Sequence, residues 1–185
     1  MLSVKRMNSL LMAVIICMVS FMMPSVSKAE LTSGTNTISA DKTAQWSENE
    51  AESYDLRIHH WSDEWYNAAY IGFSIPEDFS VSEVERAELL IYTDSISASA
   101  TANLYEADYS AFDNNAQYNT SADIPSYNSE PLTSFTPASP GKTVKVNISD
   151  YIKSLGDGAH NVGFRIDIPS KGKNNGWGIQ RIAGT

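Results

Sequence analysis

The stretch at residues 69–93 constrains the fold more than any other part of this sequence. Its first part, Ala69 to Ile75, alternates apolar with polar or small residues, which is the period of a half-buried strand. Pro76 then ends the pattern, because proline has no N–H to donate to a neighbouring strand. A second alternating run follows at Ala87 to Tyr92. Two such strands form one face of a sheet, and that face needs a second layer to cover it.

The same period of two recurs along the chain, in the runs 54–59, 144–148 and 162–168, with weaker candidates at 37–40, 98–105 and 176–182. One short helix is predicted at Asp150 to Leu155, with Ser149 as its N-cap and Gly156 at its exit. No helical pattern is long enough for the crossover of a parallel sheet. The sequence therefore predicts an all-β fold, an antiparallel β-sandwich of jelly-roll type with one short helix and long loops. Residues 106–143 form the longest segment without a clear pattern.

The N-terminal segment has the features of a secretory signal peptide. Lys5 and Arg6 precede an apolar run that ends at Met23, and small residues flank a cleavage site near Ala29. The run is shorter than the roughly 20 apolar residues of a transmembrane helix. We therefore expect a signal peptide at residues 1–29, a single domain at residues 30–185, and an extracellular location that includes a bacterial cell surface.

Charge and cysteine content exclude several functions. The chain has 13 basic and 22 acidic residues; residues 1–29 hold three of the basic ones and no acidic one, so residues 30–185 carry 10 and 22. This acidic excess argues against nucleic acid as a partner. Cys17, the one cysteine, lies inside the predicted signal peptide, so the predicted domain contains no residue for thiol chemistry. The basic residues concentrate after Gly141, which fits either strands that neutralise acidic neighbours or a patch for an anionic ligand.

Two pairs of strands carry a resemblance to a known family. Phe73-Ser74-Ile75-Pro76 followed by Ala87 to Tyr92 is one half, and Val144 to Ile152 followed by Asn161 to Ile166 is the other. This pattern resembles the DNRLRE-type β-sandwich domains, which include family 96 carbohydrate-binding modules. The resemblance implies a β-sandwich that binds polysaccharide. It departs from the family at Ser74, where the family has Asp, and in its final strand, which this chain lacks before it stops at Thr185. That departure leaves three alternatives, which are an open sheet edge, a longer protein and a strand supplied by a partner.

Aromatic residues in polar segments that are predicted to be loops are the candidates for sugar binding, because sugar C–H faces stack on aromatic rings while polar neighbours bind the hydroxyls. The motif HWSDEWY at residues 60–66 has this mix, and Trp177 lies in a second polar stretch beside basic residues. The alternative is that these tryptophans close the open end of the sandwich. The candidate carbohydrate-binding residues are Trp61, Trp65, Tyr66, Trp177, His60, Asp63, Lys173 and Arg181.

Metal and catalytic sites find less support. His59 and His60 are adjacent in a predicted strand, so their side chains point to opposite faces and do not share an ion. We expect no cofactor, although the oxygen-rich loops leave a structural Ca²⁺ ion as an open alternative. No pair of carboxylates is marked by context as a glycosidase pair.

The favoured function is therefore a secreted, non-catalytic carbohydrate-binding module with a polysaccharide as its partner. One alternative is a structural or adhesive cell-surface domain that pairs through an open sheet edge with another chain. A second alternative is a polysaccharide-degrading enzyme.

Overall fold

The computed structural model describes residues 36–47, 56–62, 65–96, 100–137, 139–169 and 176–179. Contacts divide the chain into residues 1–35 and 36–185, and all the described residues lie in the second unit. The predicted signal peptide therefore lies outside the described residues. None of the helices in the described part of the chain is long and apolar enough to span a membrane.

The described residues form ten strands and one α-helix, with three short 3-10 helices between strands. The strands are β1 (Lys42–Ser47), β2 (Leu56–Ser62), β3 (Trp65–Ser74), β4 (Glu88–Ile96), β5 (Ala102–Ala107), β6 (Ala116–Tyr118), β7 (Tyr127–Phe135), β8 (Lys142–Asn147), β9 (Asn161–Asp167) and β10 (Gly176–Ile179). The helices are α2 (Ser149–Leu155), η1 (Val81–Glu83), η2 (Tyr109–Ala111) and η3 (Ser121–Asp123).

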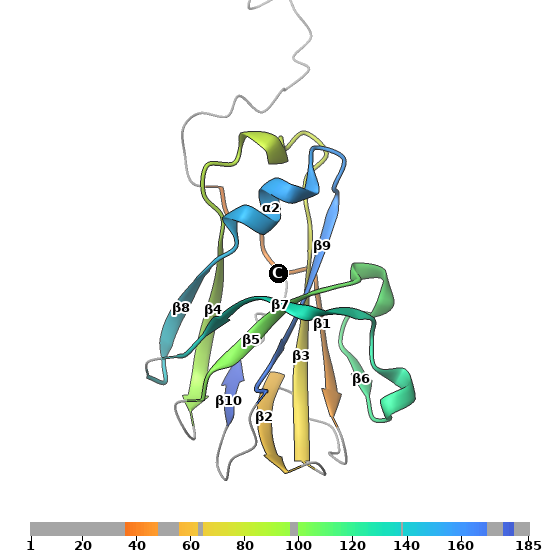
Figure 1. The fold of residues 1–185 in the computed structure, drawn as a ribbon, viewed down its shortest axis with the longest axis vertical. Helices are drawn as coiled ribbons and strands as arrows, with labels where there is room; N and C mark the ends of the chain where they lie inside the picture. Colours follow the sequence, from red (N-terminus) through yellow and green to blue (C-terminus); the bar gives the residue numbers. More distant parts are fainter. Residues whose placement is uncertain are drawn as a thin grey trace, which may run out of the picture. The chain divides into compact units, whose positions relative to one another are not determined.

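The strands lie in two layers that one long strand connects (Figure 1). The first layer has the order β6-β1-β3-β9-β5-β7, and the second has the order β2-β10-β4-β8. Strand β3 pairs with β9 through residues 69–74 and with β2 through residues 65–67, so it passes from one layer to the other. The all-β sandwich with one short helix that the sequence predicts is confirmed.

The main core lies between the layers. It joins the inner positions of β3 and β9, such as Ile71 and Phe164, to those of β2 and β4, such as Ile58 and Ile91. Helix α2 and η1 close one end, with Ile152 and Val81 packed into this core. These are the apolar positions of the alternating runs, so the period of two correctly identifies the inner faces.

Some boundaries differ from the prediction. The first strand begins at Lys42 rather than Thr37. Helix α2 begins at Ser149, one residue earlier than predicted, so its N-cap is Ile148 rather than Ser149 and makes no side-chain capping bond. The N–H of Ser149 donates to the side chain of Asn147 at 3.0 Å instead. Gly156 ends the helix with φ of 72°, as the sequence suggests.

Strand β10, the last described strand, pairs with β2 on one side and β4 on the other. It therefore lies inside its layer, and the edge strands of the described fold are β6, β7 and β8. Strand β7 contains Pro131, which limits further pairing at that edge.

Candidate functional site

The outer face of the first layer carries polar and aromatic residues on three neighbouring strands. Arg165 of β9 lies opposite Tyr70 of β3 on one side and opposite Tyr105 of β5 on the other. Directly opposite residues in antiparallel strands share a face, so this register produces a row of tyrosine, arginine and tyrosine across the sheet.

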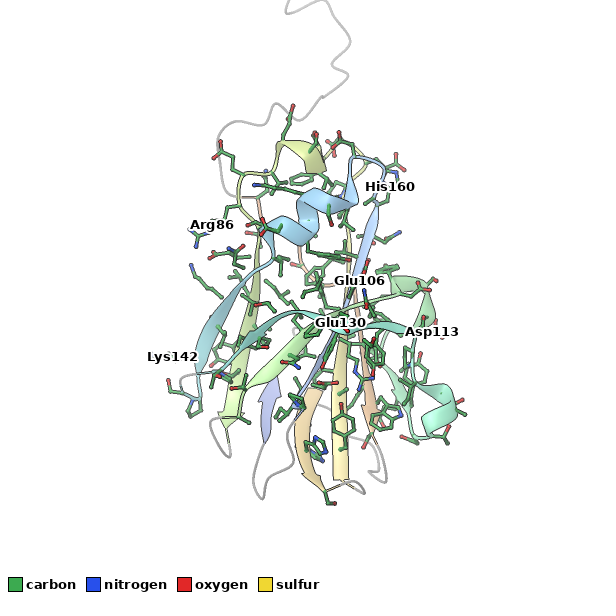
Figure 2. The ribbon with its side chains drawn as sticks, viewed as in Figure 1. Arg86, Glu106, Asp113, Glu130, Lys142 and His160 are labelled. Carbon is green, nitrogen blue, oxygen red and sulfur yellow. The ribbon has the colours of Figure 1, made fainter. Side chains whose placement is uncertain are left out.

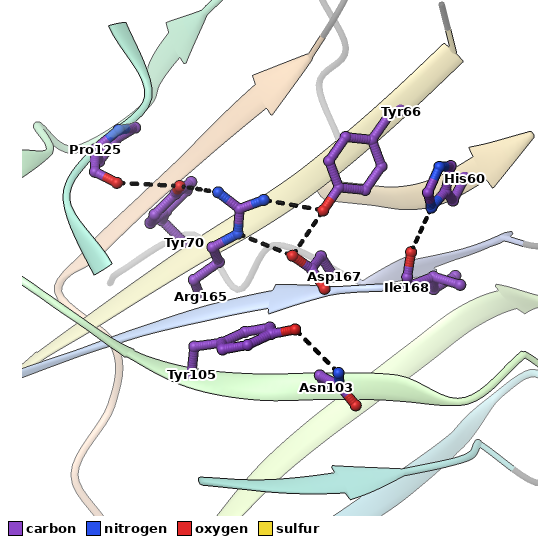
Figure 3. Close-up of polar contacts among 9 residues, drawn as sticks. All are labelled: His60, Tyr66, Tyr70, Asn103, Tyr105, Pro125, Arg165, Asp167 and Ile168. Atoms are coloured by element: carbon purple, nitrogen blue, oxygen red, sulfur yellow. Dashed lines mark hydrogen bonds and ion pairs between the residues drawn. The ribbon is translucent and has the colours of Figure 1, made fainter. Parts of the chain in front are cut away.

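The guanidinium of Arg165 is held by three partners (Figure 3). Its Nε donates to Asp167 Oδ2 at 3.0 Å, its Nη1 to the hydroxyl of Tyr70 at 2.8 Å, and its Nη2 to the hydroxyl of Tyr66 at 2.9 Å. The Tyr66 hydroxyl in turn donates to Asp167 Oδ2 at 2.6 Å, which closes a ring of hydrogen bonds. We call Tyr66, Tyr70, Arg165 and Asp167 the arginine network.

The arginine network contains an ion pair, Arg165 and Asp167, that is buried away from water. Arg165 is 2% exposed and Asp167 is 4% exposed. Burial raises the pKa of Tyr66 above its ordinary value and that of Tyr70 to about 12, although the positive charge of Arg165 lowers both. Burial alone would lower the pKa of Arg165, but the adjacent tyrosines and Asp167 raise it. Both tyrosines therefore stay neutral donors and acceptors at physiological pH.

Two further tyrosines extend this face toward the sheet edge. The ring of Tyr127 on β7 lies over the guanidinium of Arg165, with its centroid 4.0 Å from Cζ. Tyr105 meets Tyr127 edge to face at 5.6 Å and accepts a hydrogen bond from Asn103 at 2.9 Å. Tyr127 is 39% exposed, whereas Tyr105 is buried, so Tyr127 is where the aromatic row reaches solvent.

Residues 108–126, which we call the cover segment, lie over the other part of this face. The segment is closed at its base by the N–H of Asp108, which donates to the carbonyl of Ser126 at 3.0 Å. Its Phe112 packs in a second core with Trp46 and Tyr70, and the indole N–H of Trp46 donates to the carbonyl of Thr120 at 3.0 Å. The cover segment thus buries the β1 and β3 side of the outer face and leaves the β7 side open.

The structure brings together two residues of the predicted sugar-binding set, His60 and Tyr66. Their rings lie 4.6 Å apart at the β2–β3 hairpin, and Trp46 meets Tyr66 at 5.3 Å. Ile168 follows β9 directly, and its carbonyl accepts a hydrogen bond from His60 Nδ1 at 2.8 Å. Through Tyr66, the predicted site is continuous with the arginine network.

The other predicted residues are described less fully. The predicted loop position of these aromatics is wrong, because Trp61 lies near the end of β2 and Trp65 begins β3, so both belong to a strand hairpin. Their side chains lie outside the described part. Trp177 lies in β10, at the register position opposite Ile58. Asp63, Lys173 and Arg181 lie outside the described residues.

Among the described residues, no group of three or more metal-binding side chains comes together. Two of the acidic loop residues accept hydrogen bonds from serines instead, Asp108 within its own loop and Asp157 from two serines at η1. Asp108 accepts from the N–H and hydroxyl of Ser110, and Asp157 accepts from Ser80 and Ser82. These hydrogen bonds lower the pKa of both carboxyl groups.

Comparison with models of protein families matches residues 27–179 to carbohydrate-binding module family 96. The chain belongs to this family. The match covers most of the sequence and confirms the resemblance drawn from the strand pattern of this family 96 module. A search of curated proteins found no match to it.

Sequence reasoning missed the arginine network of this family 96 module. Arg165 and Asp167 alternate with apolar residues in β9, which made them look like solvent-facing positions. A signal was nevertheless present, because Tyr66 and Tyr70 occupy the same alternate positions of the paired strand β3. Tyrosine hydroxyls that share a face with an arginine on the paired strand can accept its hydrogen bonds.

Proposed function

We propose that this protein is a secreted, non-catalytic module that binds a polysaccharide through aromatic side chains at the β2–β3 hairpin. The membership in carbohydrate-binding module family 96 supports the class of ligand. The basic and apolar N-terminal segment, with its small residues near Ala29, supports secretion.

The observation that carries the proposal is the anchoring of the hairpin aromatics. The Tyr66 hydroxyl accepts a hydrogen bond from Arg165 and donates one to Asp167, and the Tyr66 ring contacts both His60 and Trp46. These contacts fix the ring without any ligand. A surface that is already ordered loses little side-chain entropy on binding, so more of the contact energy appears as affinity.

The remaining predicted residues take roles in this proposal by their chemistry. Trp61, Trp65 and Trp177 supply rings for stacking on sugar C–H faces. Asp63 accepts hydrogen bonds from sugar hydroxyls, and Lys173 and Arg181 donate to hydroxyl or acidic groups of the polymer.

Affinity gel electrophoresis against a panel of soluble polysaccharides tests this proposal. We expect retention of the wild-type protein by at least one polymer, and a loss of about fivefold to tenfold in affinity for Trp61→Ala and for Trp65→Ala, since a stacked ring contributes on the order of 1 kcal/mol. Tyr92→Ala, on the outer face of the second layer, is the control and leaves retention unchanged. A wild-type protein that no polysaccharide retains would refute the proposal.

The non-catalytic part of the proposal has its own test. The purified protein is incubated with every polymer that retains it, and reducing ends and unsaturated products are measured. We expect neither above a buffer blank, whereas release of either product would make the protein an enzyme.

A further inference from the structure

We propose that Tyr127 forms a second sugar-stacking surface on the outer face of the first layer, and that this surface accepts a neutral sugar ring. The inference rests on the proposed function, because it assigns a further subsite and a ligand class to the same polysaccharide-binding module. It concerns the β7 edge rather than the hairpin that the sequence indicates.

The orientation of the Tyr127 ring is fixed from two sides. One face lies on the guanidinium of Arg165 at 4.0 Å, and Tyr105 contacts the ring at an interplanar angle of 74°. Tyr127 is nevertheless 39% exposed. The guanidinium and Tyr105 therefore hold the ring while more than a third of the residue stays open to solvent, and an ordered, exposed ring is what a stacked sugar needs.

Arg165 supports this ring but does not meet the ligand. Its three nitrogens donate to Asp167, Tyr70 and Tyr66, and only 2% of the residue is exposed. Its charge is compensated by Asp167 at 3.0 Å. Arg165 is therefore a positioning residue, and it offers no free cation to an acidic sugar.

The charge around Tyr127 argues for a neutral ligand. Residues 87–141 include β5, the cover segment and β7, and contain no lysine or arginine. Glu130, which lies on β7 with Tyr127 and is labelled in Figure 2, is acidic and exposed. An anionic polymer would be repelled there, whereas the hydroxyls of a neutral sugar can bond with exposed polar side chains such as Asn128 and Ser129.

Tyr92 provides a matched comparison. It lies on β4 in the second layer and is 37% exposed, almost the same fraction as Tyr127. No described aromatic ring or cation stacks on it. If exposure alone made a tyrosine a binding surface, the two residues would contribute equally.

The experiment compares Tyr127→Leu, Tyr127→Phe and Tyr92→Leu by affinity electrophoresis on neutral hydroxyethylcellulose, xylan and galactomannan and on anionic polygalacturonate. Thermal unfolding of each variant checks that it is folded. We expect Tyr127→Leu to lose affinity by about fivefold to tenfold on the neutral polymer that retains wild type, since a stacked ring contributes on the order of 1 kcal/mol. Tyr127→Phe and Tyr92→Leu stay within about twofold, because the first keeps the ring and the second lies on the other layer.

The outcomes separate this inference from the proposed function. Wild type retained by a neutral polymer, with Tyr127→Leu retained equally well, overturns the inference and leaves the hairpin proposal intact. Wild type retained only by polygalacturonate overturns the neutral ligand class. Wild type retained by none of the polymers refutes the proposed function and this inference with it.

Discussion

Each layer of the sandwich has an arginine–carboxylate pair two residues apart in sequence, and the two pairs differ in distance and in burial. Arg165 and Asp167 meet at 3.0 Å with side chains 3% and 6% exposed, whereas Arg86 and Glu88 meet at 2.6 Å with 73% and 23% exposed. The exposed pair has the shorter distance, but water screens it and its net contribution is small. We therefore expect burial, rather than distance, to determine how much the free energy of unfolding falls when such a pair is broken.

The cover segment accounts for the difference. Over β1 and β3 it turns an outer face into a second interior, with Trp46, Tyr70 and Phe112 packed together. The outer face of β4 and β8 has no described segment over it, and Leu90 and Tyr92 remain exposed there. The same sheet geometry therefore yields a buried polar network on one layer and an ordinary solvated surface on the other.

Removing the charge of Asp167 is the most severe way to test this comparison. We expect Asp167→Asn to lower the free energy of unfolding by about 3–5 kcal/mol, because it leaves Arg165 buried without its counter-charge. Glu88→Gln, the matched change at the exposed pair, should cost less than about 1 kcal/mol. Denaturant unfolding measures both, and equal losses would contradict the contrast between the two faces.

A methyl group under the cover segment should have the next largest effect. A Cβ at Gly163 would lie 2.6 Å from the carbonyl oxygen of Ala107 and 3.0 Å from the N–H nitrogen of Tyr109. Both are backbone atoms, one at the end of β5 and one in the cover segment, so Gly163→Ala should cost about 1–3 kcal/mol through displacement of the chain at this junction. Gly158→Ala is the control, because nothing lies within 4 Å of its Cβ position. If the two variants unfold at the same denaturant concentration, the close backbone contact at Gly163 does not affect the free energy of unfolding.

The buried tyrosines predict a loss of stability in alkaline solution. Burial raises the pKa of Tyr70 to about 12, whereas in the unfolded chain a tyrosine titrates near about 10. The folded state thus holds this proton longer, so its contribution is complete below about pH 10 and is lost as the pH rises to about 12. Denaturant unfolding across this range should show the decline, and Tyr70→Phe should reduce its slope. Stability of the wild type that is constant up to about pH 12 would rule out this linkage.

The smallest effect is expected on the open face of the second layer. Leu90 is 53% exposed, so Leu90→Ser should change the free energy of unfolding by no more than about 0.5 kcal/mol. Thermal unfolding provides the measurement. A loss comparable with that of Gly163→Ala would mean that this face is covered after all.

The fold class was accessible from the sequence because the inner faces obey strict alternation. Ile71, Phe164 and Val146 fall at alternate positions of their strands, and each packs in the main core. Strand β7 could not be recognised in this way. Its first residues, Tyr127 to Pro131, are all exposed at the edge of the sheet, so burial imposes no alternation on them.

The candidate site was only partly accessible. The aromatic motif at residues 60–66 marks a segment in which the structure places His60 and Tyr66 in contact, because the hairpin is local in sequence. The arginine network depends on Tyr66, Arg165 and the cover segment, which lie far apart in the chain. Strand pairing and a covering loop create that network, and neither can be derived from the local pattern of β9.

The position of β10 has a consequence for how the protein is made. This strand separates β2 from β4, although both of those strands, which end at Ser62 and Ile96, leave the ribosome long before it. Until Gly176 to Ile179 are synthesised, β2 and β4 each present an unpaired edge toward the same gap. A nascent or truncated chain in that state can recruit a strand from a neighbouring molecule. Four residues near the end of the chain therefore complete the second layer, and losing them should favour aggregation.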